Sequence, residues 1–145
     1  MKGKISINIR SARTMKIVDR REINNLVMDA QKLNVLRSLC SPTSDPGVAW
    51  RGGINRMQFG TGSTAESVSD THLVSPITPI KTVTTQFFST SVKFTAYLLA
   101  NEANGFPITE AGLITTEGDL AARKVFSKID KTADYIVEFE WVISC

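Results

Sequence analysis

The residues that could perform catalysis or bind a metal are few in this chain of 145 residues. His72 is the only histidine, which excludes sites with several histidine ligands, and Cys40 and Cys145 have none of the short spacings of a metal-binding motif. Ser69 and Asp70 lie next to His72, but closeness in a polar segment does not create the geometry of a catalytic triad, and the chain has no Gly-x-Ser-x-Gly motif. We therefore expect no catalytic residue, no metal site and no cofactor.

Two closely spaced glycines, Gly60 and Gly62, invite comparison with phosphate-binding loops. The segment lacks the lysine and the spacing of Gly-x4-Gly-Lys-Ser/Thr, and no amphipathic helix follows it. We interpret both glycines as backbone devices that allow a positive φ or a bulge where a strand ends.

Glu110 is the one acidic residue in an otherwise apolar strand pattern. A buried carboxylate must be paired, because otherwise its pKa shifts and it becomes neutral. If the chain turns at Gly118, Gly112 opposes Arg123, and Glu110 is the diagonal neighbour of that arginine, within its reach. We predict a buried ion pair between Glu110 and Arg123, with Gly112 leaving room for the arginine side chain to cross the sheet.

These residues belong to three segments with strand patterns. Residues 106–113 and 120–126 are separated by a polar turn, and residues 135–143 alternate between an apolar face, which includes Trp141, and a polar face. A period of two with β-branched and aromatic residues is typical of a half-buried strand. We expect these three strands to form a meander on which the other segments pack.

The remaining segments also favour β-structure. Further strands are predicted for residues 54–60 and 83–99, and the apolar spacing of residues 29–40 predicts a helix with Asp29 as its N-cap. Trp50, in the turn-rich segment that follows, is either a lid over the core or an anchor for a partner. The predicted fold class is mainly β: an antiparallel β-sandwich with one short helix and an N-terminal arm.

We divide the chain into an N-terminal arm, residues 1–22, and a β-sandwich domain, residues 23–145. The arm begins with three isoleucines on one face of a short strand and continues with basic residues. An isolated strand is unstable in water, so we expect the arm to add to the sheet of a neighbouring subunit or partner. The residues assigned to this contact are Ile5, Ile7, Ile9, Arg10, Arg13, Lys16, Arg20 and Arg21.

The net charge of +3 conceals an asymmetry along the chain. Up to Arg56 there are eleven Lys and Arg against four Asp and Glu, and from Met57 onward there are six against ten. The basic half of one copy could contact the acidic half of a neighbouring copy, or the basic half could contact an acidic partner. An ordinary surface of mixed charge explains the distribution equally well. No aromatic residues are interleaved with the basic ones, so we do not expect direct nucleic-acid binding.

Other features place the chain among soluble globular proteins made in the cytoplasm. No apolar run approaches the roughly 20 residues of a membrane span, and the alternating N-terminus lacks the apolar core of a secretion signal. Two cysteines provide no disulfide framework. An interchain bond through Cys145 is the alternative to two free thiols.

Four motifs follow one another within residues 25–143: Gly-x-Gly with a later Asp-Thr-x-Leu, Ile-x-Glu-x-Gly-Leu before a glycine turn, an arginine-bearing strand followed by Lys-Thr-x-Asp, and a final aromatic strand. The residues that carry them are Gly60, Gly62, Ile108, Glu110, Gly112, Leu113, Gly118, Arg123, Lys131 and Trp141. In this order they resemble a domain of tail-collar fibre and baseplate-associated proteins of tailed bacteriophages.

The resemblance implies a non-enzymatic structural component of a tailed-phage virion, in which the motif residues have a structural role. It favours a tail or baseplate part that docks fibres, and it leaves open a capsid decoration (cement) protein that stabilises the head. The implied partners are other virion proteins and further copies of the chain, with a trimer favoured. The implied location is the virion, assembled in the host cytoplasm.

Overall fold

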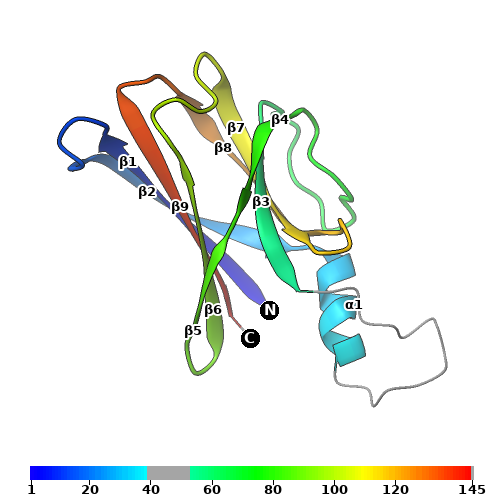
Figure 1. Ribbon diagram of the computed structural model, residues 1–145. Helices are drawn as coiled ribbons and strands as arrows, with labels where there is room; N and C mark the ends of the chain where they lie inside the picture. Colours follow the sequence, from blue (N-terminus) through cyan, green and yellow to red (C-terminus); the bar gives the residue numbers. More distant parts are fainter. Residues whose placement is uncertain (39–52, 145) are drawn as a thin grey trace.

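The computed structural model describes residues 1–38 and 53–144, which form nine strands and one helix (Figure 1). In chain order they are β1 (Lys2–Ser11), β2 (Ile17–Val27), α1 (Asp29–Ser38), β3 (Ile54–Gly60), β4 (Pro76–Thr82), β5 (Thr84–Phe87), β6 (Ser91–Leu98), β7 (Pro107–Thr115), β8 (Leu120–Asp130) and β9 (Tyr135–Ser144).

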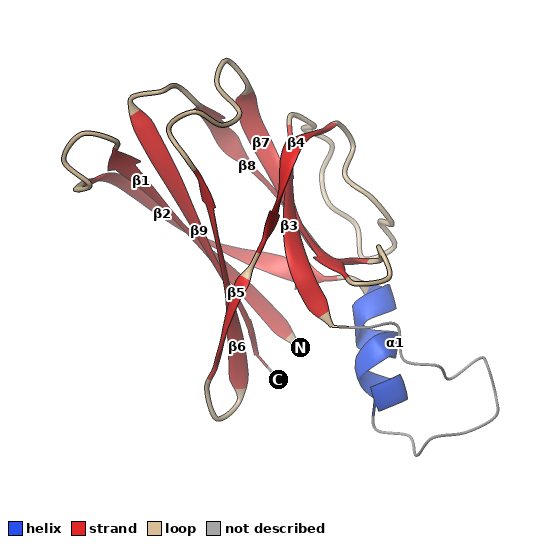
Figure 2. Cartoon of the chain, in the orientation of Figure 1, coloured by secondary structure: helices blue, strands red, loops and turns tan. Residues whose placement is uncertain are grey.

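The strands form two antiparallel sheets, one with the order β2-β1-β9-β6-β5 and the other with the order β4-β3-β7-β8 (Figure 2). The end of β2 joins them, because Leu26 and Val27 pair with β8. Val83 alone separates β4 from β5, so this stretch passes from the edge of one sheet to the edge of the other (Figure 1). The predicted fold class, a mainly β antiparallel sandwich with one short helix, is confirmed.

The core lies between the two sheets. Phe59 of β3 and Phe139 of β9 meet across it with their ring centroids 4.6 Å apart. Trp141 is fully buried, and its indole Nε1 donates a hydrogen bond to Asn25 Oδ1 at 3.0 Å. Burial of one large apolar side chain stabilises the fold by about 1.5–3 kcal/mol, so this row of aromatic residues is a main source of stability.

The predicted meander is wrong at its third strand. β7 and β8 pair as a hairpin, but β9 pairs with β1 and β6 in the other sheet. The connection between β8 and β9 therefore crosses from one sheet to the other, and the two strands face each other through the core, with the rings of Phe126 and Phe139 6.3 Å apart. The apolar face of β9 only required a buried partner layer, which a facing sheet provides as well as a neighbouring strand.

The predicted N-terminal arm is also wrong. β1 lies between β2 and β9 in the middle of a sheet, and Ile5, Ile7 and Ile9 are buried in the core of their own chain. The division into residues 1–22 and residues 23–145 does not hold, because β2 runs through its boundary. An isolated strand must add to a sheet, and here the sheet belongs to the same molecule.

α1 begins at Asp29 as predicted, but Asp29 is not its N-cap. The carbonyl of Met28 accepts the amides of Gln31 and Lys32 at 3.1 and 3.2 Å, which places Asp29 inside the first turn. Its carboxylate pairs instead with Lys32 Nζ at 3.2 Å. The predictions for Cys40, Trp50 and Cys145 concern residues outside those that the structure describes.

Candidate functional site

The centre of the motif region is a buried ion pair between β7 and β8. Gly112 opposes Arg123 in the ladder, as predicted, and Glu110 lies diagonally across from the arginine. Arg123 Nε and Nη2 each lie 3.0 Å from Glu110 Oε2, and the two residues are 1% and 0% exposed. The predicted Glu110–Arg123 pair is confirmed.

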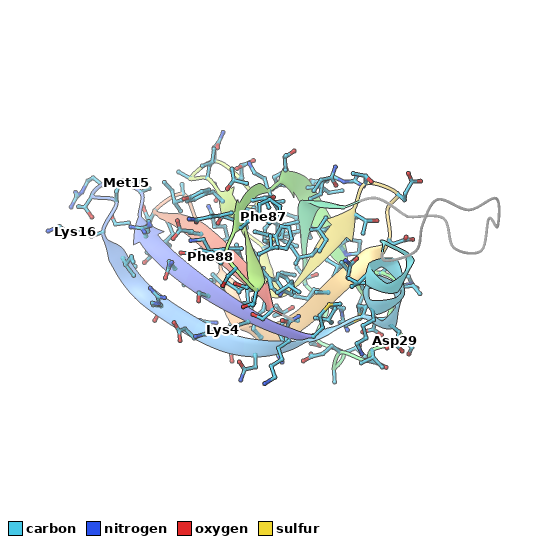
Figure 3. The ribbon with its side chains drawn as sticks, turned by 90° about the horizontal axis from the view of Figure 1, so that it is seen from below. Lys4, Met15, Lys16, Asp29, Phe87 and Phe88 are labelled. Atoms are coloured by element: carbon cyan, nitrogen blue, oxygen red, sulfur yellow. The ribbon has the colours of Figure 1, made fainter. Side chains whose placement is uncertain are left out.

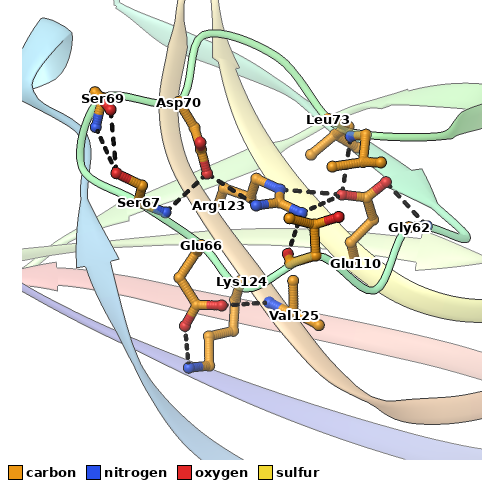
Figure 4. A network of polar contacts seen from close by, with 12 residues as sticks. Gly62, Glu66, Ser67, Ser69, Asp70, Leu73, Glu110, Arg123, Lys124 and Val125 are labelled. Atoms are coloured by element: carbon orange, nitrogen blue, oxygen red, sulfur yellow. Dashed lines mark hydrogen bonds and ion pairs between the residues drawn. The ribbon is translucent and has the colours of Figure 1, made fainter.

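Arg123 also holds the long loop between β3 and β4, residues 61–75. Its Nη1 donates to Asp70 Oδ2 at 2.8 Å, and its Nη2 donates to the carbonyl of Thr64 at 2.8 Å (Figure 4). Next to it Lys124 Nζ pairs with Glu66 of the same loop. One strand, β8, therefore presents two cations that bind successive parts of this loop.

The carboxylate of Glu110 binds backbone amides at both ends of this loop. Oε1 accepts the amide of Gly62 at 3.1 Å (Figure 4) and that of Ser75 at 2.8 Å, and Oε2 accepts the amide of Val74 at 3.1 Å. Thr109 Oγ1 adds a bond to the carbonyl of Gly62 at 2.7 Å. A carboxylate has lone pairs for several amides at once, so Glu110 can satisfy the backbone donors of a loop segment that does not pair with a strand. We call Thr64, Glu66, Asp70, Glu110, Arg123 and Lys124 the loop clamp.

The motif glycines allow close packing around the loop clamp. A Cβ on Gly60 or Gly62 would lie 2.5 Å from Glu110 Oε1, and one on Gly112 would lie 2.9 Å from the Leu73 side chain. Neither Gly60 nor Gly62 has a positive φ, so the interpretation based on φ is wrong. We predicted that Arg123 fills the space beside Gly112, but the nearest side chains there belong to Leu73 and Leu120.

The acidic residues of the loop are held in their charged form. Burial alone would raise the pKa of Asp70, but the Ser67 amide and the Arg123 guanidinium outweigh it and hold this pKa below its ordinary value. Burial likewise opposes ionisation of Glu66, but the ammonium of Lys124 and the backbone amides of Glu66 and Val125 together outweigh it, so the pKa of Glu66 is also lowered. The lowered pKa values mean that the charged form of both carboxylates stabilises the folded loop at neutral pH.

Lys131, another motif residue, fixes the connection before β7. Its buried Nζ donates to Asn104 Oδ1 at 2.9 Å and to the carbonyl of Thr132 at 2.9 Å. Burial lowers the pKa of Lys131, and the carboxylate of Glu102 partly opposes this effect. The bound loop also contains Glu102, whose carboxylate pairs with Lys81 at 2.8 Å.

The loop clamp is suited to holding a loop and presents no reactive group. Both oxygens of Glu110 already accept hydrogen bonds, and the pair is closed to solvent. Asp70, the neighbour of His72 in sequence, binds Arg123, while His72 Nδ1 lies 2.8 Å from the carbonyl of Leu73. Ser69 Oγ lies 3.1 Å from Ser67 Oγ, so these three residues do not form a triad.

The basic residues assigned to a partner contact lie on or near the β1–β2 hairpin. Three pair within the chain: Arg10 with Glu138 at 3.4 Å, Arg20 with Glu22 at 3.1 Å, and Arg21 with Asp19 at 3.6 Å. Arg13 and Lys16 belong to the hairpin turn and form no ion pair with any residue that the structure describes; Lys16 lies at its tip beside Met15 (Figure 3). The isoleucines and the basic residues thus have separate roles.

A surface that the sequence interpretation missed surrounds the β5–β6 hairpin. Phe87 is 78% exposed and Phe88 is 51% exposed (Figure 3). Phe88 also lines a cavity of about 430 Å³ together with Met1, Val92 and Ile143. The signal in the sequence is a pair of phenylalanines in a stretch without charge, inside the strand pattern predicted for residues 83–99.

Among residues 1–38 and 53–144, no helix is long and apolar enough to cross a membrane, and no three His, Cys, Asp or Glu side chains are grouped as a metal site requires. Comparisons of the chain with protein-family models, with curated proteins and with solved structures found no match.

Proposed function

We propose that the protein is a non-enzymatic structural component of a tailed-bacteriophage virion, and specifically a tail or baseplate part that docks fibres. The observation that supports this proposal is the convergence of the resembling motifs. Gly-x-Gly, Asp-Thr-x-Leu, the Glu110 strand and the Arg123 strand lie far apart in sequence but meet in one buried network. Motifs that serve to hold a loop on a rigid sandwich suit a protein whose task is to present a fixed surface to other proteins.

The proposal has a direct test in particles produced by the genome that encodes the chain. Purified particles should contain the chain in stoichiometric amounts by mass spectrometry, and cryo-electron microscopy should show density of this sandwich at the tail or baseplate. Density on the outer face of the capsid would instead identify a decoration protein. Absence of the chain from purified particles would reject the virion role itself.

An enzymatic role is tested separately. We expect the purified chain to hydrolyse no substrate in a broad panel of esters, phosphoesters, glycosides and peptides. His72→Ala should fold like the parent, because the His72 ring contacts only the adjacent carbonyl among the hydrogen bonds of the described residues. Turnover that is present in the parent and lost in this variant would overturn the non-enzymatic proposal.

A further inference from the structure

The two outer edges of the sandwich differ in how well they are protected from pairing. β4 carries Pro76 and Pro79, which have no backbone N–H to offer to another strand. β5 has no proline, and within the described residues its one strand neighbour is β6. Edge strands of soluble proteins are usually protected by proline, charge or a covering segment, so an edge with neither proline nor charge is suited to pairing.

The hydrogen-bond pattern shows which backbone groups of β5 face outward. The amide of Phe88 donates to the carbonyl of Ser91 at 2.8 Å, so this pair is hydrogen-bonded, and the register then makes Gln86 and Thr84 the next hydrogen-bonded positions. Thr85 and Phe87 lie between them. Their N–H and C=O groups therefore point away from β6, toward the side of β5 on which the described residues place no further strand.

We propose that β5 pairs with β5 of a second copy of this chain, antiparallel and around a two-fold axis, so that one sheet continues through both molecules. In the simplest register the axis passes beside Gln86, and Thr85 of one copy faces Phe87 of the second copy. Each pair of outward-facing residues then exchanges two main-chain hydrogen bonds, and the exposed Phe87 rings are covered.

The charge distribution favours a second copy as the occupant. In a two-fold contact the same edge of both copies is in contact, so like charges on that edge would face each other and repel. Between Lys81 and Lys93 the chain has no charged residue. The two flanking lysines are already neutralised within the chain, Lys81 by Glu102 at 2.8 Å and Lys93 by Glu140 at 3.3 Å.

The contact is short, since β5 spans Thr84–Phe87, so we expect reversible association rather than a permanent dimer. A two-fold contact joins copies in pairs and does not build the trimer that the resemblance implies. The inference is independent of the proposed virion role, because it rests on the edge geometry of the isolated chain.

Sedimentation equilibrium of the full chain over a concentration series tests the proposal. We expect a monomer–dimer equilibrium. Thr85→Pro removes an outward N–H that the fold does not use, and Phe87→Lys places like charges beside the axis; each should weaken association at least tenfold. Val18→Lys is the matched control, because it adds the same charge at another exposed apolar position, in β2, which is not a neighbour of β5 in the sheet.

A mixing experiment tests the two-fold geometry. Phe87→Lys mixed with Phe87→Glu should form a heterodimer, because opposite charges then meet near the axis. Hydrogen exchange should also slow at the amides of Thr85 and Phe87 as concentration rises. A monomeric or trimeric parent, unchanged association in both β5 variants, or no recovery in the mixture would overturn the proposal; a monomeric parent would leave the edge to a strand of another protein.

Discussion

The amide of Gly62 donates to Glu110 Oε1 at 3.1 Å, and a Cβ on residue 62 would lie 2.5 Å from that same oxygen. The absence of a side chain at Gly62 and the presence of a carboxylate at Glu110 are thus two parts of one contact. The carboxylate can reach the loop backbone only where no side chain separates them.

Gly62→Ala should destabilise the protein by about 1–3 kcal/mol, because the added methyl group displaces Glu110 from its bonds to the loop. Urea denaturation monitored by tryptophan fluorescence measures the change. Ser63→Ala is the control, since Ser63 is the exposed neighbour of the glycine. Equal stability of Gly62→Ala and the parent would show that the loop adjusts without loss.

Glu110→Ala should lower the free energy of unfolding by at least about 2 kcal/mol, because it leaves Arg123 buried without its main partner. In a double-mutant cycle with Arg123→Ala the two losses should not add, since both variants remove the same interaction. Glu22→Ala, which removes a solvent-exposed partner of Lys4, should have a much smaller effect. Additive losses at Glu110 and Arg123 would contradict the coupling.

Deletion of residues 1–22 should abolish folding, because it removes β1 from the middle of its sheet. The single variant Ile7→Ala should cost about 2–5 kcal/mol, as expected for a fully buried side chain. Val18→Ala, at a position 56% exposed, should have little effect and serves as the control. A truncated chain with the circular dichroism and cooperative unfolding of the parent would show that the strand is dispensable.

Acid should weaken the loop clamp. The folded-state pKa values of Asp70 and Glu66 lie below the ordinary values of 3.8 and 4.5, so their stabilisation is complete above those values and is lost as the pH falls through the folded-state pKa values. Unfolding free energy should therefore decline below about pH 4.5. Asp70→Asn should be less stable than the parent at neutral pH but show a shallower acid decline.

The sequence alone determined several of the strands, but not β2 or β4, and it determined the local pairing around Gly118. Alternation predicted most of β9 correctly, because a period of two reports which face of a strand is buried, and the strand predicted for residues 54–60 is β3. The Glu110–Arg123 pair followed from the short turn, since a tight hairpin sets the register of the two strands that it joins. Both results depend on residues close together in the chain.

Only the tertiary structure decided where β1 and β9 lie and what the loop clamp binds. An apolar face shows that a strand must pack against another layer. Backbone hydrogen bonds are the same for every strand, so the sequence does not identify which strand is the partner. The sequence therefore allowed β9 to be assigned to β8, and β1 to another molecule. The amides of Gly62, Val74 and Ser75 meet Glu110 because the whole loop folds back over β7. Backbone donors are the same in every residue except proline, and therefore only their position in space distinguishes them.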